Sequence, residues 1–269
     1  MSDVTDRLVW RSTDGGPPSA DSDALVVEEP LEIRCGGEAL SVTMRTPGHD
    51  RELALGFLVS ERVLTDPTSV RDVVQSAGGP SANVIDVRLA PGVHVELERL
   101  TRHVFTSSSC GLCGKTAIEA VHHQLPPLDD DVMVDARTVL DLPVALAAAQ
   151  TAFARTGGLH AAAVFAADGS LLVVREDVGR HNAVDKVLGY GFAAGLLPWR
   201  GHILLVSGRA SFEIVQKALA ARIPIVAAVS APSSLAVSFA DESNQTLIGF
   251  LRPGRLNVYT HPHRIRFER

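Results

Sequence analysis

Two cysteines separated by two residues are the strongest chemical signal in this sequence. Cys110 and Cys113 stand in a run rich in serine and glycine, Ser107-Ser108-Ser109-Cys110-Gly111-Leu112-Cys113-Gly114-Lys115. The run lies between a predicted strand and a predicted helix. A helix N-terminus and a neighbouring lysine both favour the thiolate, which is the nucleophilic form of cysteine. We therefore expect thiol chemistry at this loop.

Three kinds of thiol site fit this spacing to different degrees. A structural zinc site needs two more ligands, but Cys35 is distant and His122-His123 follows Cys113 too closely, so we expect no metal. A dithiol redox pair fits the spacing, although more than a hundred residues precede it. A sulfur carrier needs a nucleophilic thiol on a polar loop, and a second thiol could release the sulfur by forming a disulfide. The last two interpretations remain open on the residues alone.

Three strand-to-helix turns in the second half gather polar and small residues, and they suggest a binding pocket. They are Arg175–Asn182, Ser207–Ser211 and Ser230–Ser234. Ligands of open α/β sheets bind beyond the carboxyl ends of strands, where helix N-termini offer free N–H groups to phosphate. Arg180 and Arg209 could pair with phosphates bidentately.

The alternative interpretation of each turn is a tight connection with capping serines. Three such turns in succession, two with arginine, favour an anionic ligand such as a nucleotide. The candidate binding residues in the turns are Arg180, His181, Ser207, Gly208, Arg209, Ser230, Ser233 and Ser234. A lone histidine at a strand start, such as His160, is more often structural. Glu176, Asp177, Arg180 and His181 could instead form a buried ion network.

The elements that must position these turns follow from hydrophobic periodicity and turn residues. We predict strands over 25–33, 37–45, 83–89, 93–97, 160–166, 171–175, 203–206, 225–229, 246–251 and 255–259. We predict helices over 50–61, 116–124, 139–154, 182–189, 212–221 and 235–240, with Asp50 as a helix cap. Strands alternating with helices predict an α/β protein whose mixed sheet has parallel members and is flanked by helices.

The predicted organisation has three parts. Residues 1–23 are polar and acidic and are expected to form a flexible tail. Residues 24–134 form a smaller, strand-rich N-terminal α+β subdomain that ends with the cysteine loop and a helix. Residues 135–269 form the α/β domain that carries the pocket.

Composition excludes several classes of protein. The chain has 269 residues, 46% hydrophobic and 21% charged, which is typical of a globular protein. A formal net charge of −6 disfavours general nucleic-acid binding. Three cysteines are too few for a secreted disulfide scaffold, so we expect a cytoplasmic protein. No targeting segment is evident, and Pro224 and Pro232 interrupt the uncharged stretch 223–240, so no membrane insertion is expected.

Several segments together resemble one family, the formate dehydrogenase accessory sulfurtransferases of the FdhD type. The resemblance runs from about residue 25 to the end. It rests on Thr46-Pro47-Gly48-His49-Asp50 with Glu52-Leu53-Ala54-Leu55-Gly56-Phe57-Leu58, Ser108-Ser109-Cys110-Gly111-Leu112-Cys113-Gly114-Lys115, Thr156-Gly157-Gly158-Leu159-His160-Ala161-Ala162, Arg175-Glu176-Asp177-Val178-Gly179-Arg180-His181-Asn182-Ala183-Val184-Asp185-Lys186, Ser207-Gly208-Arg209 with Phe212-Glu213, and Ser230-Ala231-Pro232-Ser233-Ser234.

The resemblance implies a cytoplasmic sulfur carrier required for formate dehydrogenase activity. A cysteine desulfurase would load sulfur onto Cys110 as a persulfide, with Cys113 as an auxiliary thiol. The sulfur would pass to the molybdenum (or tungsten) bis-guanine-dinucleotide cofactor, whose GDP or GMP moiety the protein would recognise. The family's cofactor-contacting segment corresponds to Phe250, Leu251, Arg252, Pro253, Gly254 and Arg255.

The resemblance further implies a homodimer and a core similar to that of cytidine deaminases. The deaminase zinc motif is absent from this sequence, so zinc-dependent deamination is not expected. Two alternatives remain, a non-catalytic chaperone for the cofactor and a dithiol oxidoreductase. The chaperone would need the pocket but not Cys110, and the oxidoreductase would need both cysteines but not the pocket.

Overall fold

The fold is that of a computed structural model of the chain, which describes residues 3–76, 83–93, 95 and 125–268. Its strands are β1 (Val4–Arg11), β2 (Ser19–Val26), β3 (Glu29–Cys35), β4 (Glu38–Arg45), β5 (Val70–Gln75), β6 (Val84–Leu89), β7 (Val134–Asp135), β8 (His160–Phe165), β9 (Leu171–Asp177), β10 (Ile203–Val206), β11 (Ile225–Ala228), β12 (Thr246–Arg252), β13 (Arg255–Thr260) and β14 (Ile265–Arg266). Its helices are α1 (Asp50–Ser60), α4 (Ala136–Ala149), α5 (Thr151–Thr156), α6 (Arg180–Ala193), α7 (Phe212–Ala220) and α8 (Ser234–Glu242), with short 3₁₀ turns at Pro67–Ser69 and Pro262–Arg264.

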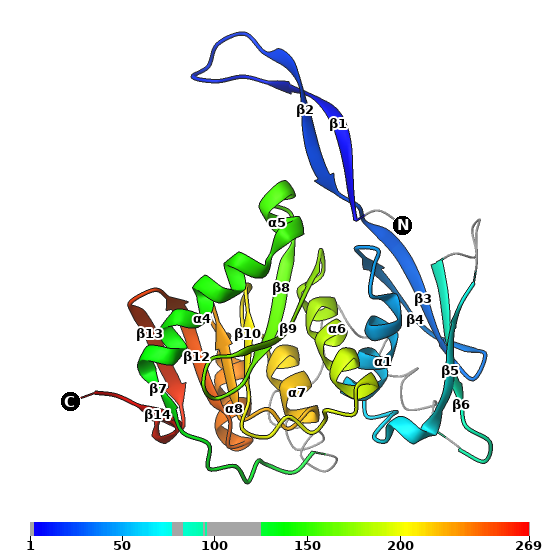
Figure 1. The fold of residues 1–269 in the computed structure, drawn as a ribbon, viewed down its shortest axis with the longest axis vertical. Helices are drawn as coiled ribbons and strands as arrows, with labels where there is room; N and C mark the ends of the chain where they lie inside the picture. Colours follow the sequence, from blue (N-terminus) through cyan, green and yellow to red (C-terminus); the bar gives the residue numbers. More distant parts are fainter. Residues whose placement is uncertain (1–2, 77–82, 94, 96–124, 269) are drawn as a thin grey trace.

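The main sheet has six strands in the order β13-β12-β11-β10-β8-β9. Its central strands β10 and β11 are buried along their whole length, as expected of parallel strands covered on both faces. Alternate residues of β8, β10 and β11 pack against α4 on one face and against α6, α7 and α8 on the other. The predicted α/β architecture with a mixed sheet flanked by helices is therefore confirmed (Figure 1).

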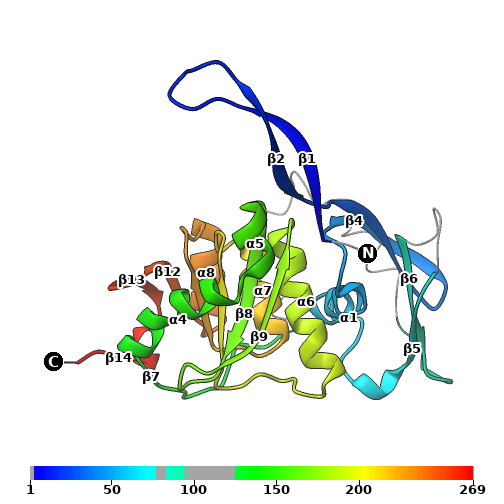
Figure 2. The ribbon, with the colours of Figure 1, turned by 45° about the horizontal axis from the view of Figure 1, so that its top comes forward.

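A second, four-stranded sheet has the order β4-β3-β6-β5 and packs against α1. Helix α1 lies between this sheet and α6, so the two helices join the two sheets (Figures 1 and 2). Gly56 of α1 and Gly189 of α6 allow a very close crossing. A Cβ atom on Gly56 would lie 1.7 Å from the backbone oxygen of Asp185. The smaller, strand-rich part therefore contacts the main sheet through α1 and α6. The close crossing of these two helices is possible only because glycine occupies the contact positions.

Four strands of the main sheet end at the same edge. Strands β10, β11 and β12 run parallel, whereas β8 is antiparallel to both β10 and β9. It follows that β9 runs in the direction of β10, and that β8 begins where its neighbours end. We call this edge the carboxyl edge; it carries the start of β8 and the turns that follow β9, β10, β11 and β12.

The first residues do not form the tail that we predicted over 1–23. Strands β1 and β2 pair along eight residues and form a hairpin that projects from the body (Figure 1). Strand β1 contains the apolar run Leu8-Val9-Trp10 between Arg7 and Arg11, and residue types of this kind favour a strand even within a polar, acidic segment. The predicted boundary between residues 134 and 135 stays a prediction.

Two further local predictions are wrong. Asp50 does not cap α1, because its carboxylate accepts hydrogen bonds from the buried Arg45 at 2.9 and 3.0 Å, and His49 is the N-cap residue. The single helix predicted over 139–154 is instead two helices, α4 and α5, which meet at Gln150. The predicted helix over 116–124 lies outside the described residues, as does most of the predicted strand over 93–97. No helix in the described part of the chain is long and apolar enough to cross a membrane.

Candidate functional site

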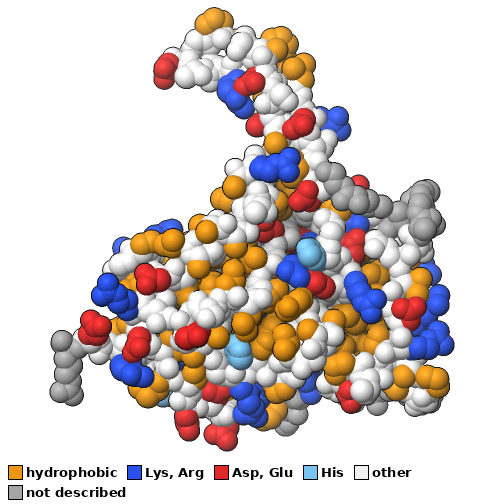
Figure 3. All heavy atoms as spheres, in the orientation of Figure 1, with side chains coloured by type: hydrophobic (Ala, Val, Ile, Leu, Met, Phe, Trp, Pro, Cys, Tyr) orange, Lys and Arg blue, Asp and Glu red, His pale blue; other side chains and the backbone are white. Residues whose placement is uncertain are grey.

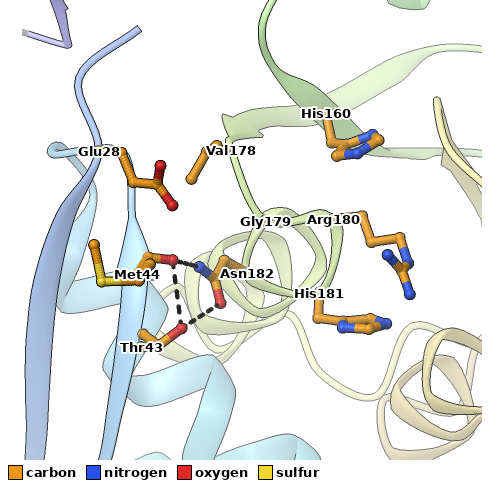
Figure 4. Close-up of a pocket in the computed structure, with 9 residues that line it drawn as sticks. All are labelled: Glu28, Thr43, Met44, His160, Val178, Gly179, Arg180, His181 and Asn182. Atoms are coloured by element: carbon orange, nitrogen blue, oxygen red, sulfur yellow. Dashed lines mark hydrogen bonds between the residues drawn. The ribbon is translucent and has the colours of Figure 1, made fainter. Parts of the chain in front are cut away.

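A pocket of about 340 Å³ opens where the carboxyl edge meets strand β4. We call it the basic pocket, because three basic side chains stand together on one of its sides (Figure 4). Its lining residues are Glu28, Thr43, Met44, His160, Val178, Gly179, Arg180, His181 and Asn182. The pocket is thus built from the N-terminus of α6, the start of β8 and the outer strand of the smaller sheet.

Asp177, the last residue of β9, holds the backbone at the pocket floor. Its buried carboxylate pairs with Lys186 at 2.7 Å. It also accepts hydrogen bonds from the N–H groups of Gly179 at 2.8 Å and Thr46 at 3.2 Å. The turn into α6 is thereby fixed to the turn between β4 and α1. The ion network suggested for Glu176, Asp177, Arg180 and His181 does not form. Asp177 pairs instead with Lys186, Glu176 accepts hydrogen bonds from the N–H groups of Ala152 and Phe153, and Arg180 and His181 line the pocket.

The first turn of α6 offers hydrogen-bond donors to the pocket. Gly179 is the N-cap residue and supplies no side-chain cap, so N–H groups of the first turn are left for a ligand. The Nε atom of Arg180 is buried and has no hydrogen-bond partner among the described residues. A buried polar atom without a partner is costly in a folded protein and calls for an explanation. An anion bound at this helix end would satisfy it.

His160 borders the same space and is held against the turn after β10. A Cβ atom on Gly208 would lie 3.3 Å from Nδ1 of His160 and 3.7 Å from Cδ of Arg180, so a larger residue would crowd both side chains. Burial, and then the charges of Arg180 and His181, lower the pKa of His160. His160 is therefore a neutral hydrogen-bonding group near pH 7. We favoured a structural role for this residue, but it also lines the pocket.

His181 makes a defined contact with α7. Its Nε2 atom lies 2.9 Å from a carboxylate oxygen of Glu213 and 3.2 Å from Oγ of Ser211. The hydrogen bond with His181 lowers the pKa of the Glu213 carboxyl against the opposing effect of burial. The turn after β10 thus contributes to the pocket by orienting a side chain of α6.

The opposite side of the pocket combines polar groups with the apolar side chain of Met44. Nδ2 of Asn182 donates to the backbone oxygen of Met44 at 2.8 Å, and Oγ1 of Thr43 donates to Oδ1 of Asn182 at 3.2 Å. Glu28 completes this side from the connection between β2 and β3 (Figure 4). This arrangement can hold a ligand with an anionic group at the basic side and a less charged group against β4.

The other predicted residues divide into three groups. Gly208 packs against the pocket residues, while Ser207 accepts a hydrogen bond from the N–H of Ala161 and Ser233 caps α8 by accepting from Ala236. These serines therefore hold backbone, as the alternative interpretation of the turns requires. Arg209 and Ser234 are exposed at the carboxyl edge. The N–H of Ser230 donates to the backbone oxygen of Gly208 at 3.3 Å, which joins two of the turns.

The predicted segment 250–255 covers the last three residues of β12, the turn after it and the first residue of β13, at the same edge. Phe250 is exposed and has a left-handed backbone with φ of 51°, and its N–H donates to the backbone oxygen of Ser230. Arg252, Pro253, Gly254 and Arg255 are exposed around the β12–β13 turn. Leu251 does not belong in a binding site, because its side chain is fully buried in the core beside α4. Alternation along the strand turns it away from the surface that its neighbours share.

The cysteine loop lies outside the described residues, so Cys110 and Cys113 stay predictions from the sequence. Cys35 is described and buried, and burial raises the pKa of its thiol to about 11, which makes it unreactive. Within the described ranges, no group of three or more histidine, cysteine or acidic residues is placed to hold a metal ion.

The sequence reasoning missed six of the lining residues, which are Glu28, Thr43, Met44, Val178, Gly179 and Asn182. The last three stand in the polar turn that follows β9 and could have been found there. The first three lie more than a hundred residues earlier in the chain, and no local pattern indicates that β4 faces the N-terminus of α6.

Comparisons with known proteins agree with this architecture. The model of the FdhD/NarQ family matches residues 26–266. The chain is 52% identical to the sulfur carrier protein FdhD of Streptomyces avermitilis, over 98% of this chain and 97% of that one. It is 53% identical to the protein of the same name from Mycobacterium tuberculosis, over 90% and 92% of the two chains. A crystal structure from Desulfotalea psychrophila, described as a formate dehydrogenase accessory protein, has the same fold, with a TM-score of 0.76 over 98% of this chain at 23% identity. The chain belongs to the FdhD/NarQ family.

Proposed function

We propose that this protein is a sulfur carrier for the maturation of formate dehydrogenase, and that it binds its substrate, a molybdenum or tungsten bis-guanine-dinucleotide cofactor, through the basic pocket. Family membership and the names of close relatives support the carrier role. The observation that supports the substrate site is the buried Nε of Arg180, which has no hydrogen-bond partner in the described part of the chain, at the N-terminus of α6, which no side chain caps. Phosphate groups are the ligands that such a helix end and a guanidinium favour.

The thiol chemistry that we propose takes the two electrons for each sulfide release from Cys110 and Cys113, and a cellular thiol reductant must then reduce their disulfide before the next turnover. The Cys110 thiolate attacks the terminal sulfur of a persulfide on a cysteine desulfurase, and the donor cysteine leaves as a thiolate. Cys110 then carries the added sulfur. The Cys113 thiolate next attacks the Cys110 sulfur, the sulfur–sulfur bond breaks, and sulfide leaves for the metal of the substrate while a Cys110–Cys113 disulfide forms.

Intact-protein mass spectrometry tests the carrier role. The protein is incubated with a cysteine desulfurase and cysteine, and the wild type is compared with Cys110→Ala and Cys113→Ala. A reducible gain of one sulfur atom that is lost only with Cys110→Ala is the expected result. A protein that gains no sulfur yet binds GDP would instead be a chaperone for the cofactor, and one that gains no sulfur but cycles between dithiol and disulfide would be an oxidoreductase.

The partners follow from this proposal. The cysteine desulfurase is the donor, and the catalytic subunit of formate dehydrogenase receives the sulfurated cofactor. A cytoplasmic location and a homodimer stay predictions, and analytical ultracentrifugation would test the second of them.

A further inference from the structure

We propose that Glu28 selects the base of the nucleotide in the basic pocket, and that the base it selects is guanine. This role rests on the proposed function, which places a nucleotide in that pocket, and it names the residue that distinguishes one nucleotide from another. Glu28 lies in the connection between β2 and β3. It lines the pocket on the side opposite to His160, Arg180 and His181 (Figure 4).

The charge of Glu28 is opposite to the charge that a phosphate site needs. Glu28 is the only acidic residue among the described residues that line the pocket. A carboxylate repels an anionic ligand, so it weakens phosphate binding unless it makes a favourable contact of its own. Its side chain is exposed, and the described residues give it no hydrogen bond and no ion pair. The carboxylate is therefore available to a ligand.

The other polar side chains on this side of the pocket are already engaged. Nδ2 of Asn182 donates to the backbone oxygen of Met44 at 2.8 Å and to the carboxylate of Asp177 at 3.0 Å. Oδ1 of Asn182 accepts a hydrogen bond from Oγ1 of Thr43 at 3.2 Å. Asn182 and Thr43 therefore hold β4 against α6. Glu28 is the group that remains for the polar edge of a ligand.

The chemistry of a carboxylate restricts which base it can bind. An ionised carboxylate accepts hydrogen bonds and donates none. Guanine presents two adjacent donors, N1–H and the 2-amino group, which match the two oxygens of a carboxylate. Adenine and cytosine each place an acceptor nitrogen beside their amino group, and uracil has a single N–H between two carbonyl oxygens. Each of these bases would direct a lone pair at the carboxylate, so Glu28 favours guanine among the common bases.

Apolar groups line the same part of the pocket as the carboxylate. Met44 of β4 and Val178 of the turn after β9 lie beside Glu28 (Figure 4). A thioether packs favourably against an aromatic ring, so Met44 offers a contact to the face of a purine. The volume of about 340 Å³ is within the range of small-molecule sites. The base and the phosphates of one nucleotide would thus occupy opposite sides of the pocket.

Calorimetry with GDP, IDP and ADP tests this assignment on the full-length protein, at pH 7 and with EDTA present. The three ligands carry the same phosphates, while IDP lacks the 2-amino group and ADP has an acceptor at N1. A hydrogen bond to a charged group contributes about tenfold or more to affinity. We therefore expect the wild type to bind GDP about tenfold more tightly than IDP and about 100-fold more tightly than ADP.

The substitution Glu28→Gln separates recognition of the base from simple electrostatics. Loss of a negative charge beside a phosphate site would by itself tighten the binding of all three nucleotides. Loss of the guanine contact should instead weaken GDP binding by about tenfold or more without weakening ADP binding. Glu28→Asp keeps the charge and should keep a preference for GDP over ADP. Glu38→Gln removes a carboxylate from an exposed site on β4 and should match the wild type.

The possible failures are distinguishable. If the wild type binds neither GDP nor ADP, the assignment of the pocket is wrong, and the role of Glu28 is wrong with it. If the wild type binds GDP and ADP equally, or if Glu28→Gln keeps the preference for GDP, the role of Glu28 alone is overturned. A preference that appears only when Mg²⁺ replaces EDTA would mean that the carboxylate acts through a bound cation, which also overturns direct contact with the base. Melting curves on all variants separate these results from loss of fold.

Discussion

Arg180 is the side chain on which the substrate proposal depends most directly. Its Nε atom is buried without a partner among the described residues, at the start of a fourteen-residue helix. An interaction that remains unsatisfied in the free protein is one that a ligand can complete. Removal of the Arg180 guanidinium should therefore weaken ligand binding without lowering the stability of the free protein.

We expect Arg180→Gln to weaken GDP binding by about 10- to 100-fold, because a hydrogen bond to a charged group contributes about 1.5–3 kcal/mol. The free energy of unfolding of the free protein should not decrease. Calorimetry and urea denaturation measure the two effects, with Arg137→Gln on the exposed side of α4 as the matched control. Unchanged GDP affinity in Arg180→Gln would remove the basic pocket from the proposed function.

The ion pair between Glu52 and Arg175 predicts that the stability of the protein depends on pH. Burial alone would raise the pKa of this carboxyl, but hydrogen bonds and charge from Arg175, with a smaller contribution from His49, lower it from 4.5 to about 2. Arg175 donates to Glu52 through Nε and through a second nitrogen at 2.7 Å, and so ties β9 to α1. A lowered pKa in the folded state means that the stabilisation is present above pH 4.5 and is lost as the pH falls toward 2.

We therefore expect Glu52→Gln to lower the free energy of unfolding at pH 7 by about 2–3 kcal/mol. Between pH 4.5 and 2, its stability should fall less steeply than that of the wild type. Urea denaturation across this range is the measurement, and Glu38→Gln at an exposed site on β4 is the control. Parallel pH profiles for Glu52→Gln and the wild type would contradict the assigned pairing.

At the scale of elements, the crossing of α1 and α6 places the smaller sheet beside the carboxyl edge. The helices approach so closely that a Cβ atom on Gly189 would lie 1.8 Å from the backbone oxygen of Glu52. A buried cluster reinforces the contact, since Nζ of Lys217 on α7 donates to Asp185 of α6 and to Ser60 of α1 at 2.8 Å each. Strand β4 reaches the pocket because these helices hold it there.

Gly56→Ala should separate the two helices, because the nearest atoms are backbone atoms that cannot rotate away. We expect a loss of about 3 kcal/mol or more in the free energy of unfolding, together with weaker GDP binding. Ala147→Gly on the exposed face of α4 changes helix propensity by about 1 kcal/mol without a clash and serves as the comparison. A Gly56→Ala protein as stable as the wild type would show that the crossing is looser than described.

At the scale of the whole molecule, the β1–β2 hairpin stands apart from the compact body (Figure 3). Its base is anchored where Val4 is buried and Val26 packs near Gly158. Farther out, Leu8 and Trp10 are 72% and 71% exposed. The family model begins at residue 26, where the hairpin ends, whereas the alignments with the Streptomyces avermitilis protein and the Desulfotalea psychrophila structure each cover 98% of this chain and so extend into the hairpin.

The two tryptophans allow the exposure of the hairpin to be measured. Trp10 is exposed and Trp199 is 1% exposed, and the chain contains no others. We expect iodide to quench the emission of Trp10, and we expect Trp10→Phe to leave emission that resists quenching. Wild-type emission that iodide does not reach would mean that the hairpin is covered in solution.

The sequence by itself determined most of the elements of the main sheet and its covering helices, where the periodicity was strong, but it did not predict strands β5, β7 and β14. Buried strands such as Ile203–Val206 and the helix that begins at Phe212 follow directly from apolar runs and turn residues. It also identified Arg180 and His181, because they stand in a polar turn that follows a strand. Local chemistry is sufficient in these cases, since the residues that decide the structure are neighbours in the chain.

The tertiary structure decided which of the predicted residues share a cavity. Ser207 and Ser233 resemble ligands in the sequence but bond to backbone, and Leu251 turns into the core between exposed neighbours. His160, Thr43 and Glu28 joined the site because strand direction and the glycine crossing bring β8 and β4 to the N-terminus of α6. The contacts of β4 with α6 join residues more than a hundred positions apart, as between Thr43 and Asn182. Their energies depend on packing across helices and sheets, which no local pattern in the sequence encodes.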